Sequence, residues 1–255
     1  MKQVMEIKNV IMDSKKNCPF CGKEKTPMTL DFGGIQRTVW PICKCEDEAY
    51  RKQQEEDKQR DRLVRLEALF KQSRLGERFK KCTFENFIKR VGTQQAYDIT
   101  KDYVENFNIY KRDGKGLLLS SIPGTGKTHL CGAITNKLLG NMTSVVFVVV
   151  PELLQKIRNT YGHGTETEAQ IMYGLTECDL LILDDVGAEK KSDWTTEKLF
   201  TVIDSRYRNN QPIIFTTNCG SQELKVRIGI RTFSRIMEVC TPVTMTCDDY
   251  RLRDF

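Results

Sequence analysis

The amino-acid sequence predicts an α/β fold in which helices cover both faces of a parallel sheet. Two observations lead to this prediction. From Gly76 onward, short apolar runs alternate with helical patterns, and a glycine-containing loop joins the first run to the helix after it. Strands that are separated by helices pair in parallel, and the helices then lie on both faces of the sheet. Because the earlier residues differ in character, we expect three parts, residues 1–46, 47–75 and 76–255.

The expected elements of residues 76–255 follow one another in regular order. The run VVFVVV is nearly all β-branched, as in a parallel strand that is buried on both faces, and Pro151 suits the first turn of a helix. Strands are expected at 115–119, 144–150, 179–183 and 212–217, and helices at 93–107, from the glycine loop to about 139, and at 151–159, 166–174 and 193–209.

The glycine loop lies between the first strand and its helix and ends in a Gly-Lys-Thr triplet. In this setting, loop N–H groups and the positive end of the helix surround phosphate groups. Lys127 would reach the β- and γ-phosphates, and the Thr128 hydroxyl would hold Mg²⁺. Ser121 stands where the usual motif has its first glycine, which is acceptable if its φ is negative. We predict an ATP or ADP site formed by Pro123, Gly124, Thr125, Gly126, Lys127, Thr128 and His129.

Paired acids follow the third expected strand, in the run DLLILDD. A buried strand that ends in Asp184 and Asp185 places both carboxylates at the carboxyl edge of the sheet, where ligands of α/β folds bind. We expect Asp184 to hold Mg²⁺ through water. Asp185 would orient and deprotonate the attacking water, a task that glutamate more often performs. On its own the pair could be a surface feature of a strand end.

Two later features belong to the same predicted site. The strand run IIFTTN ends at Asn218, whose amide could hold the attacking water or the γ-phosphate, although such a strand end can also merely open a turn. Arg231 and Arg235 lie four residues apart and so share one face of a helix. Either could reach the γ-phosphate of a neighbouring subunit, which implies self-association through the ATP site. Ordinary surface arginines are the alternative.

The cysteines before residue 46 form two closely spaced pairs, Cys18 with Cys21 and Cys43 with Cys45. A Cys-x-x-Cys turn lets two thiolates face one ion, and a second pair nearby completes a tetrahedral zinc site. Such a site needs no large core, and Phe32, Val39 and Trp40 between the pairs suffice for a small hairpin. A redox role for Cys-x-x-Cys would require a βαβ context that the segment lacks. We predict structural zinc.

A charge-dense stretch at 46–72 contains neither glycine nor proline and carries several acid-before-base pairs at i,i+4 spacing, which favours a helix. Its first half is polar on every side, as in a solvated connector. Its second half has a stripe that should pack on something, formed by Leu63, Leu66, Leu69 and Phe70. A plain linker helix and a partner-binding helix are both open interpretations.

Composition places the chain in the cytoplasm. No apolar run approaches the roughly 20 residues that span a bilayer, and the first residues lack a signal-peptide core. Ten cysteines would be unusual as disulfides in that compartment, so the six outside the two pairs are expected to be small buried side chains. The net charge of +6 permits a polyanionic partner without requiring one.

With these motifs in order, the chain resembles the AAA+ ATPases of the replicative helicase loader family (DnaC-type, bacterial or phage). Helper ATPases of some insertion-sequence transposition systems are related to that family. The resemblance covers most of the chain. It rests on Cys43-Lys-Cys45-Glu46, Arg78-Phe79, Thr83-Phe84-Glu85-Asn86-Phe87, residues 123–129, the LLILDDVGAE run, Thr217-Asn218, residues 231–240 and Asp249-Tyr250-Arg251.

The resemblance implies roles for the matching residues. Lys127 and Thr128 would bind nucleotide and Mg²⁺, Asp184 and Asp185 would be the Walker B acids, and Asn218 would be sensor I. The resemblance favours Arg235 as the arginine finger, with Arg231 as its neighbour. Since the chain ends soon after Arg251, it has no room for a full helical lid, and Arg251 is the one candidate for a sensor II arginine.

Family members grip a hexameric replicative helicase through the N-terminal module and touch single-stranded DNA through the ATPase domain. The first hypothesis is therefore an ATP-dependent helicase loader. A DNA-coating regulator of a transposase and a nucleotide-dependent scaffold without hydrolysis are the alternatives. Lys156 and Arg158 precede a glycine-rich loop and could track DNA phosphates, although a solvated helix face explains them equally well.

Overall fold

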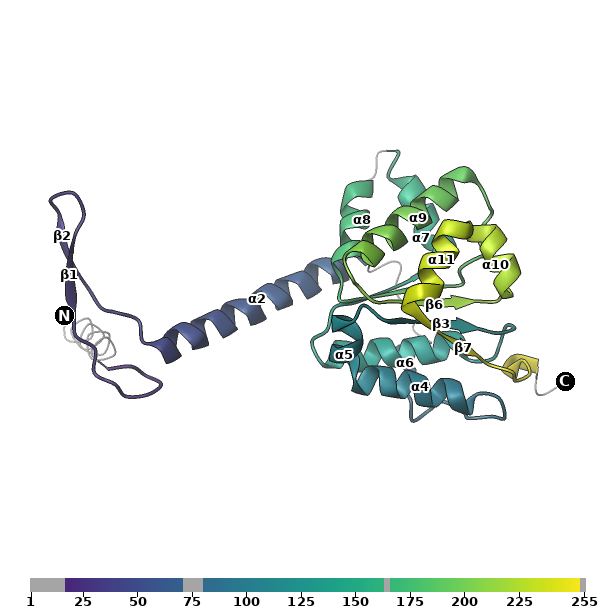
Figure 1. Ribbon diagram of the computed structural model, residues 1–255, viewed down its shortest axis with the longest axis horizontal. Helices are drawn as coiled ribbons and strands as arrows, with labels where there is room; N and C mark the ends of the chain where they lie inside the picture. The colour runs from purple at the N-terminus through teal and green to yellow at the C-terminus, as the bar shows by residue number, and fades with distance from the viewer. Residues whose placement is uncertain (1–16, 71–79, 163–165, 253–255) are drawn as a thin grey trace. The chain divides into compact units, whose positions relative to one another are not determined.

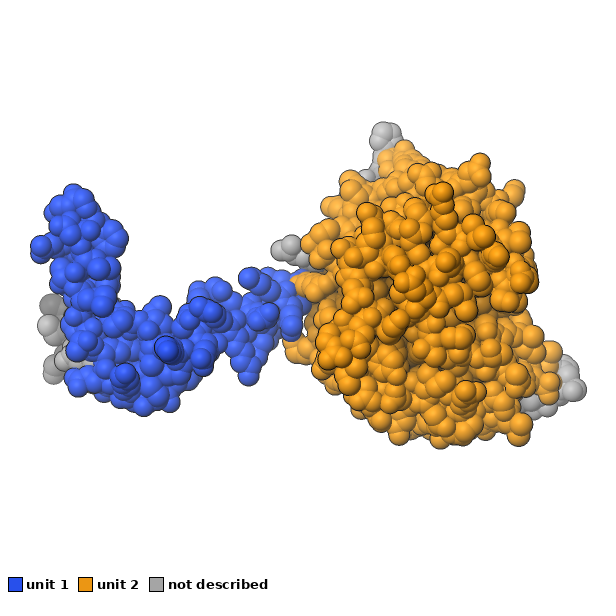
Figure 2. All heavy atoms as spheres, in the orientation of Figure 1, with its two compact units in different colours: residues 1–61 blue, residues 62–255 orange. Residues whose placement is uncertain are grey.

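The computed structural model describes residues 17–70, 80–162 and 166–252. The chain divides into two compact units, residues 1–61 and residues 62–255, which Figure 2 distinguishes by colour. The boundary lies inside helix α2 (Lys44–Phe70), so this helix contributes residues to both units. The three-part division expected from the sequence stays a prediction.

The first unit contains a small antiparallel hairpin and the first part of α2. Strands β1 (Met28–Asp31) and β2 (Gln36–Val39) pair with Met28 opposite Val39, as the prediction of a small hairpin between the cysteine pairs requires. Most hairpin side chains are exposed, and residues 51–61 of α2 are exposed without exception. Residues 17–61 therefore enclose almost no apolar core, and the first half of α2 is the solvated helix that its polar sequence predicts.

A five-stranded parallel sheet organises the second unit. Its spatial order is β4-β5-β6-β3-β7, of which Figure 1 labels β6, β3 and β7. The strands are β3 (Gly116–Ser120), β4 (Val145–Val149), β5 (Leu180–Asp184), β6 (Ile213–Thr217) and β7 (Cys240–Thr244). The first four confirm the predicted strands to within a residue at each end. The sequence analysis missed β7, which carries Pro242 and lies at the edge of the sheet, where a residue without an N–H is tolerated.

Helices cover both faces of this sheet, as predicted (Figure 1). One face carries α4 (Gln94–Glu105), α5 (Phe107–Arg112) and α6 (Lys127–Gly140). The other carries α7 (Val150–Asn159), α8 (Glu168–Glu177), α9 (Asp193–Arg208), α10 (Ser221–Ile228) and α11 (Ile230–Val239). The short helices α5 and α10 were not predicted. None of the helices in the described ranges combines the length and apolar character that a membrane span requires.

The core consists of two apolar layers, one on each side of the sheet. Successive strand residues alternate between them: Leu117 and Leu119 join the layer under α4 and α6, whereas Leu118 joins the layer under α7 to α11. Leu66 and Phe70 of α2 are buried in this second layer. Part of the apolar stripe predicted for the second half of the helix therefore packs on the core of the second unit, although the side chain of Leu69 lies outside the described residues.

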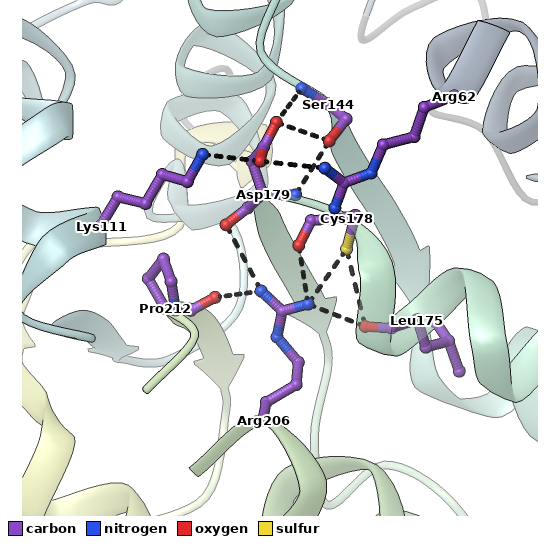
Figure 3. A network of polar contacts seen from close by, with 8 residues as sticks. All are labelled: Arg62, Lys111, Ser144, Leu175, Cys178, Asp179, Arg206 and Pro212. Atoms are coloured by element: carbon purple, nitrogen blue, oxygen red, sulfur yellow. Dashed lines mark hydrogen bonds and ion pairs between the residues drawn. The ribbon is translucent and has the colours of Figure 1, made fainter. Parts of the chain in front are cut away.

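A polar network joins several elements at the amino edge of the sheet (Figure 3). The carboxylate of Asp179 accepts hydrogen bonds from the backbone N–H of Ser144 at 2.8 Å and from its hydroxyl at 2.6 Å. It also accepts one from Nζ of Lys111 at 2.7 Å and forms an ion pair with Arg62 of α2 at 3.5 Å. Burial alone would raise the pKa of Asp179, but these donors hold it below its usual value.

Arg206 of α9 lies fully buried beside this network. Its guanidinium donates to the carbonyl oxygens of Leu175 and Cys178 at 2.9 Å and of Pro212 at 2.8 Å. These carbonyls belong to the segments that lead into β5 and β6. Hydrogen bonds from the two Nη groups offset the cost of burying this charge, whereas Nε has no partner among the described residues. Arg206 thus links the segments that lead into these two strands.

Candidate nucleotide-binding site

The phosphate loop between β3 and α6 has the backbone that its glycines permit. Gly124 has a φ of +75° and Gly126 a φ of +105°, a region that side chains disfavour. A Cβ atom on Gly126 would lie 2.8 Å from the ring of Phe87. The loop therefore requires glycine at Gly126 for both conformation and space.

Ser121 fits the position that usually belongs to glycine. Among the described residues other than glycine, positive φ occurs only at Met142, Asp185 and Asn210, so Ser121 needs no left-handed backbone. Its hydroxyl lies 2.5 Å from the Thr125 hydroxyl and accepts a hydrogen bond from Nζ of Lys127 at 3.1 Å. The serine thus adds a polar contact inside the loop.

Lys127 is buried and has four hydrogen-bond acceptors. Besides the Ser121 hydroxyl, its Nζ donates to the backbone oxygens of Ser121 and Ile122, each at 2.9 Å, and to Oδ1 of Asn218 at 2.7 Å. Burial lowers the pKa of Lys127, while the charges of Asp185 and Asp184 oppose that shift. The ammonium is therefore held at the mouth of the loop by groups that a phosphate could replace.

Asp184 ends β5 and is buried beside the loop helix. Its carboxylate accepts hydrogen bonds from the Thr128 hydroxyl at 3.2 Å and from the Thr216 hydroxyl at 2.6 Å. Burial, together with the charge of Asp185, raises its pKa to about 6. The predicted pair of Mg²⁺ ligands, Thr128 and Asp184, is thus in direct contact, and a hydroxyl beside a carboxylate is a donor set that Mg²⁺ accepts.

Asp185 has a left-handed backbone with a φ of +58°. Its N–H donates to the Thr216 hydroxyl at 2.9 Å, and its Oδ1 accepts from the amide of Asn218 at 3.0 Å. Asn218 therefore bridges Lys127 and Asp185, and Thr216 contacts both acids. Asn218 was predicted from the sequence, but Thr216 was not. The only sign of Thr216 in the sequence was its place as the first of two threonines in the IIFTTN run.

A cavity of about 650 Å³ extends from these residues over the loop. Further walls come from outside the sheet, with Phe87, Ile88 and Arg90 from the segment before α4, and Tyr250 and Arg251 from the segment after β7. The structure places all seven predicted loop residues, from Pro123 to His129, along it. Of these outer-wall residues, Sequence analysis brought forward Arg251 as the candidate for a sensor II arginine. The others were not predicted as site residues, because no local pattern links segments so far apart in the chain.

The two arginines considered as fingers differ in their surroundings. Nη2 of Arg235 pairs with Asp204 of α9 at 2.7 Å, and its guanidinium lies over the rings of Phe200 and Tyr207. Arg231 is exposed on the same helix, α11. Neither residue lines the cavity of its own chain. In this chain Arg235 is held by intramolecular partners, whereas Arg231 points toward solvent.

The four clustered cysteines come together as predicted. Their sulfur atoms all lie within 4.8 Å of one another, with Cys18 to Cys45 at 3.3 Å and Cys21 to Cys43 at 3.7 Å. Tetrahedral zinc with Zn–S bonds of about 2.3 Å separates its sulfurs by about 3.8 Å, so the donor set could hold zinc after small adjustments. The six other cysteines, all within the described residues, form no disulfide, and five of them are buried, as expected.

An ion pair supports the cysteine cluster. Nζ of Lys25 contacts Oε2 of Glu46 in the first turn of α2, and the same oxygen accepts a hydrogen bond from the backbone N–H of Cys43 at 3.2 Å. The hydrogen bond to Glu46 raises the pKa of Lys25. A positive side chain at this place would offset the negative charge of four thiolates on one ion.

The two basic residues considered for DNA contact have partners in the chain. Lys156 pairs with Glu166 at 2.7 Å. The guanidinium of Arg158 lies 4.6 Å from the ring of Trp194, and the indole N–H of Trp194 donates to the hydroxyl of Tyr161 at 3.2 Å. Arg158 is thus part of an aromatic cluster that the sequence analysis did not find, since its members come from α7, α9 and the segment after α7.

Comparison with known proteins also indicates that this site binds ATP. The family model described as "IstB-like ATP binding protein" matches residues 52–254. The Replicative helicase loader DnaC of Escherichia coli (strain K12) is 28% identical over 197 residues, which are 76% of this chain and 78% of that protein. The protein of that name from Buchnera aphidicola subsp. Baizongia pistaciae is 28% identical over 195 residues, 75% of this chain and 78% of its own length.

The chain is also similar to solved structures of a helicase loader and of a replication initiator. The crystal structure of the DnaC helicase loader matches with a TM-score of 0.60 and 26% identity, over 67% of this chain and all of that one. The replication initiator DnaA bound to AMPPCP and single-stranded DNA matches with a TM-score of 0.58 and 26% identity, over 66% of this chain and 50% of that one. The fold is thus that of AAA+ helicase loaders, and the chain belongs to the family of IstB-like ATP-binding proteins.

Proposed function

We propose that this protein is an ATP-dependent loader that binds a hexameric replicative helicase and delivers it to single-stranded DNA. The observation that carries the proposal is the contact chain from Lys127 through Asn218 to Asp185, because it connects a phosphate-binding lysine to a candidate base across three elements. The relatives named Replicative helicase loader DnaC support helicase loading as the process that uses the ATP.

The site residues divide the work of ATP hydrolysis. Lys127 binds the β- and γ-phosphates once they displace its present carbonyl partners, and the N–H groups of the loop orient the phosphate chain. Thr128 and Asp184 would hold Mg²⁺, which neutralises charge on the phosphates when bound. Asp185 orients and deprotonates the attacking water, and Asn218 fixes the direction in which that carboxylate points.

Self-association completes the site in this proposal. The γ-phosphate of one subunit would receive an arginine from the next, as in other ATPases that use a finger in trans. Because Arg235 already pairs with Asp204, the exposed Arg231 is the better candidate in this conformation. Arg235 would first have to leave its partner and the two rings of α9.

Single-stranded DNA would be held by charge and stacking. Arg158, Trp194 and Tyr161 place a guanidinium and two rings together at the surface, the combination that binds strands without reading their sequence. Such binding weakens steeply as salt rises. An affinity for single strands that does not change with salt would contradict this assignment.

The zinc module would grip the helicase. The module exposes apolar side chains that its own small fold does not bury, among them Phe32 and Ile35 between the two strands of the hairpin and Ile42 after it. Apolar groups at the surface of a small module suit an interface with another protein. Zinc would hold the module in shape, since residues 17–61 enclose almost no apolar core.

Complex formation tests the loader proposal. The full-length protein and the hexameric replicative helicase of the same organism are mixed with ATP, with ADP and without nucleotide, and the mass of the complex is measured by light scattering. We expect a complex whose stability depends on the nucleotide. The Lys127→Ala variant, which cannot hold the phosphates, should lose that dependence. Absence of a complex in all three conditions would reject the loader function.

A transposase regulator is the second candidate, because the matching family model takes its name from an IstB-like protein rather than from a loader. The same mixing experiment with the transposase of a neighbouring insertion sequence would detect it. A scaffold without hydrolysis is the third candidate. It would be established if ATP bound but no turnover occurred with helicase and single-stranded DNA present.

A further inference from the structure

Helix α2 begins at the cysteine cluster. The carbonyl oxygen of Cys43 accepts the backbone N–H groups of Glu46 at 3.0 Å and of Asp47 at 2.9 Å. Cys43 is therefore the N-cap residue immediately before the first helical residue, Lys44, and Cys45 lies in the first turn. Two of the four clustered sulfurs thus belong to the start of a 27-residue helix, and the other two belong to the earlier Cys-x-x-Cys turn.

Glu46 connects this helix start to the region of the first cysteine pair. Its Oε2 accepts the backbone N–H of Cys43 at 3.2 Å, so the acid at the third helical position satisfies the N–H of the N-cap residue, as in a capping box. The same oxygen contacts Nζ of Lys25, which follows the Cys-x-x-Cys turn. One carboxylate therefore holds the backbone of a predicted metal ligand in the geometry that starts the helix.

Cysteine is an uncommon residue at the start of a helix. The preferred N-cap residues are Ser, Thr, Asp and Asn, because their side-chain oxygen accepts an N–H of the first turn. The sulfur of Cys43 instead lies 3.3 Å from that of Cys45 and 3.7 Å from that of Cys21. Four thiolates on one Zn²⁺ carry a net negative charge, and the N-terminal end of a helix attracts negative charge. The cluster can therefore replace the missing side-chain cap once it holds a metal.

The first half of α2 lacks the packing that usually stabilises a helix. Residues 51–61 are exposed without exception, and the ion pair of Arg51 with Asp47, at 2.9 Å, joins two residues of the helix itself. Exposed pairs of this kind contribute little. Helical segments of such length are marginal in water without tertiary contacts, because the first turn is costly to form. The order of residues 44–61 therefore depends on how the start of the helix is fixed.

We propose that Cys43, Cys45 and Glu46 form a metal-dependent cap of α2, so that zinc binding and helix formation in residues 44–61 are coupled. The inference rests on the predicted zinc site and is independent of the loader function. Cys43 and Cys45 bind the metal, and Glu46 is a positioning residue that acts through the backbone of Cys43. When the cluster holds zinc, the first turn of α2 is fixed. When it does not, the solvated half of the helix frays from its N-terminal end.

Amide hydrogen exchange on the full-length protein tests the coupling directly. Exchange is compared with zinc bound and after zinc has been removed by a chelator. We expect removal to speed exchange about tenfold in residues 47–55, because fraying opens their hydrogen bonds. The change should be less than about twofold in residues 66–70, where Leu66 and Phe70 are buried. Unchanged exchange in residues 47–55 on loss of bound zinc would overturn the proposal.

Zinc affinity gives a reciprocal test, because a coupling between two processes acts equally in both directions. Gln53 lies in the exposed part of α2, where glycine disfavours a helix and alanine favours it. We expect zinc to bind about threefold more weakly to Gln53→Gly than to its matched control, Gln53→Ala, in competition with a chelating dye. Equal affinities of the two variants would show that the helix does not contribute to metal binding.

Glu46 is tested by two substitutions. Glu46→Gln keeps an oxygen for the N–H of Cys43 but loses the charge that pairs with Lys25, whereas Glu46→Ala loses both. We expect Glu46→Ala to weaken zinc binding about fivefold and to speed exchange in residues 47–55 of the zinc-bound protein, and Glu46→Gln to change the affinity less than about twofold. Equal effects of the two substitutions would contradict the positioning role.

Two failures are distinguishable. If the protein binds zinc but α2 exchanges equally with and without it, the coupling is wrong while the zinc site stands. If the unaltered protein binds no zinc, the zinc site and the coupling are both wrong. The loader function is tested separately, by the complex with the helicase.

Discussion

Nζ of Lys127 and Oδ1 of Asn218 lie 2.7 Å apart, although 91 residues separate them in the chain. The other end of the same amide donates to Asp185. A single side chain at the end of β6 therefore sets the position of both the phosphate-binding lysine and the candidate base. The central sheet makes this possible, since β6 lies between β3, which leads into the phosphate loop, and β5, which ends in the acids.

Asn218→Ala should separate hydrolysis from binding. Without the amide, Asp185 loses the donor that orients it, so we expect turnover to fall about 100-fold, while the affinity for ATP changes less than about threefold. Steady-state phosphate release and calorimetry measure the two quantities. A loss of affinity as large as the loss of turnover would show that Asn218 holds the nucleotide itself.

Asp185→Asn tests the base with little disturbance of the backbone. Asparagine tolerates the positive φ of this position as well as aspartate does, and its size is the same. Turnover should fall by about two orders of magnitude or more because the amide cannot accept a proton, and ATP should still bind. Unchanged turnover would assign the base elsewhere.

Thr216 offers a test of what sets the pKa of Asp184, the proposed Mg²⁺ ligand. Its hydroxyl favours the charged form of Asp184, so Thr216→Val should raise the pKa of Asp184 above its present value of about 6. The variant should then need more Mg²⁺ for hydrolysis at neutral pH and recover as the pH is raised toward about 8. Thr216→Ser keeps the hydroxyl and serves as the control. Equal magnesium requirements in the two variants would contradict the role.

Arg206 should be among the strongest single contributors to stability. Arg206→Ala removes a charged donor from three buried carbonyl groups, which we expect to lower the free energy of unfolding by more than about 3 kcal/mol. Arg208, two residues later, is 71% exposed and pairs with Asp204 on its own helix, so Arg208→Ala should cost less than about 1 kcal/mol. Denaturant unfolding compares them, and equal costs would refute the role of the buried network.

Asp179 predicts a pH-dependent contribution to stability. Its folded pKa lies below the unfolded value of about 3.9, so the ionised carboxylate stabilises the fold above that pH and the benefit disappears as pH falls through the folded pKa. Asp179→Asn should therefore be less stable than the unaltered protein at neutral pH, by about 1–3 kcal/mol, and the difference should shrink below about pH 4. A difference that is constant with pH would contradict this.

Much of the fold could be predicted because its signals are local. The run VVFVVV, the proline at the start of α7 and the paired acids after β5 each report on a few adjacent residues, and the structure follows them closely. The strand β7 gave a weaker signal because Pro242 argues against a strand anywhere except at an edge. Its edge position depends on the whole sheet and not on the run itself.

The candidate site was predictable where it follows motifs and unpredictable where it depends on packing. Lys127 and Asp184 carry recognisable patterns. Thr216 carries no such pattern. It forms hydrogen bonds with Asp184 and Asp185 because β6 pairs with β5, and that pairing cannot be read from one threonine in a strand. The guanidinium of Arg90 lies over the ring of Tyr250, although the two residues come from opposite ends of the domain. No local motif in the sequence could predict that contact.

Helicase loading itself tests the account most directly. The hexameric helicase is incubated with closed circular single-stranded DNA, ATP and the full-length protein, and the helicase that remains on the circles after gel filtration is measured. The account predicts that the unaltered protein places helicase on the circles and that Lys127→Ala does not, although both are folded. Equal amounts of bound helicase with the unaltered protein, with Lys127→Ala and with no added protein would contradict it.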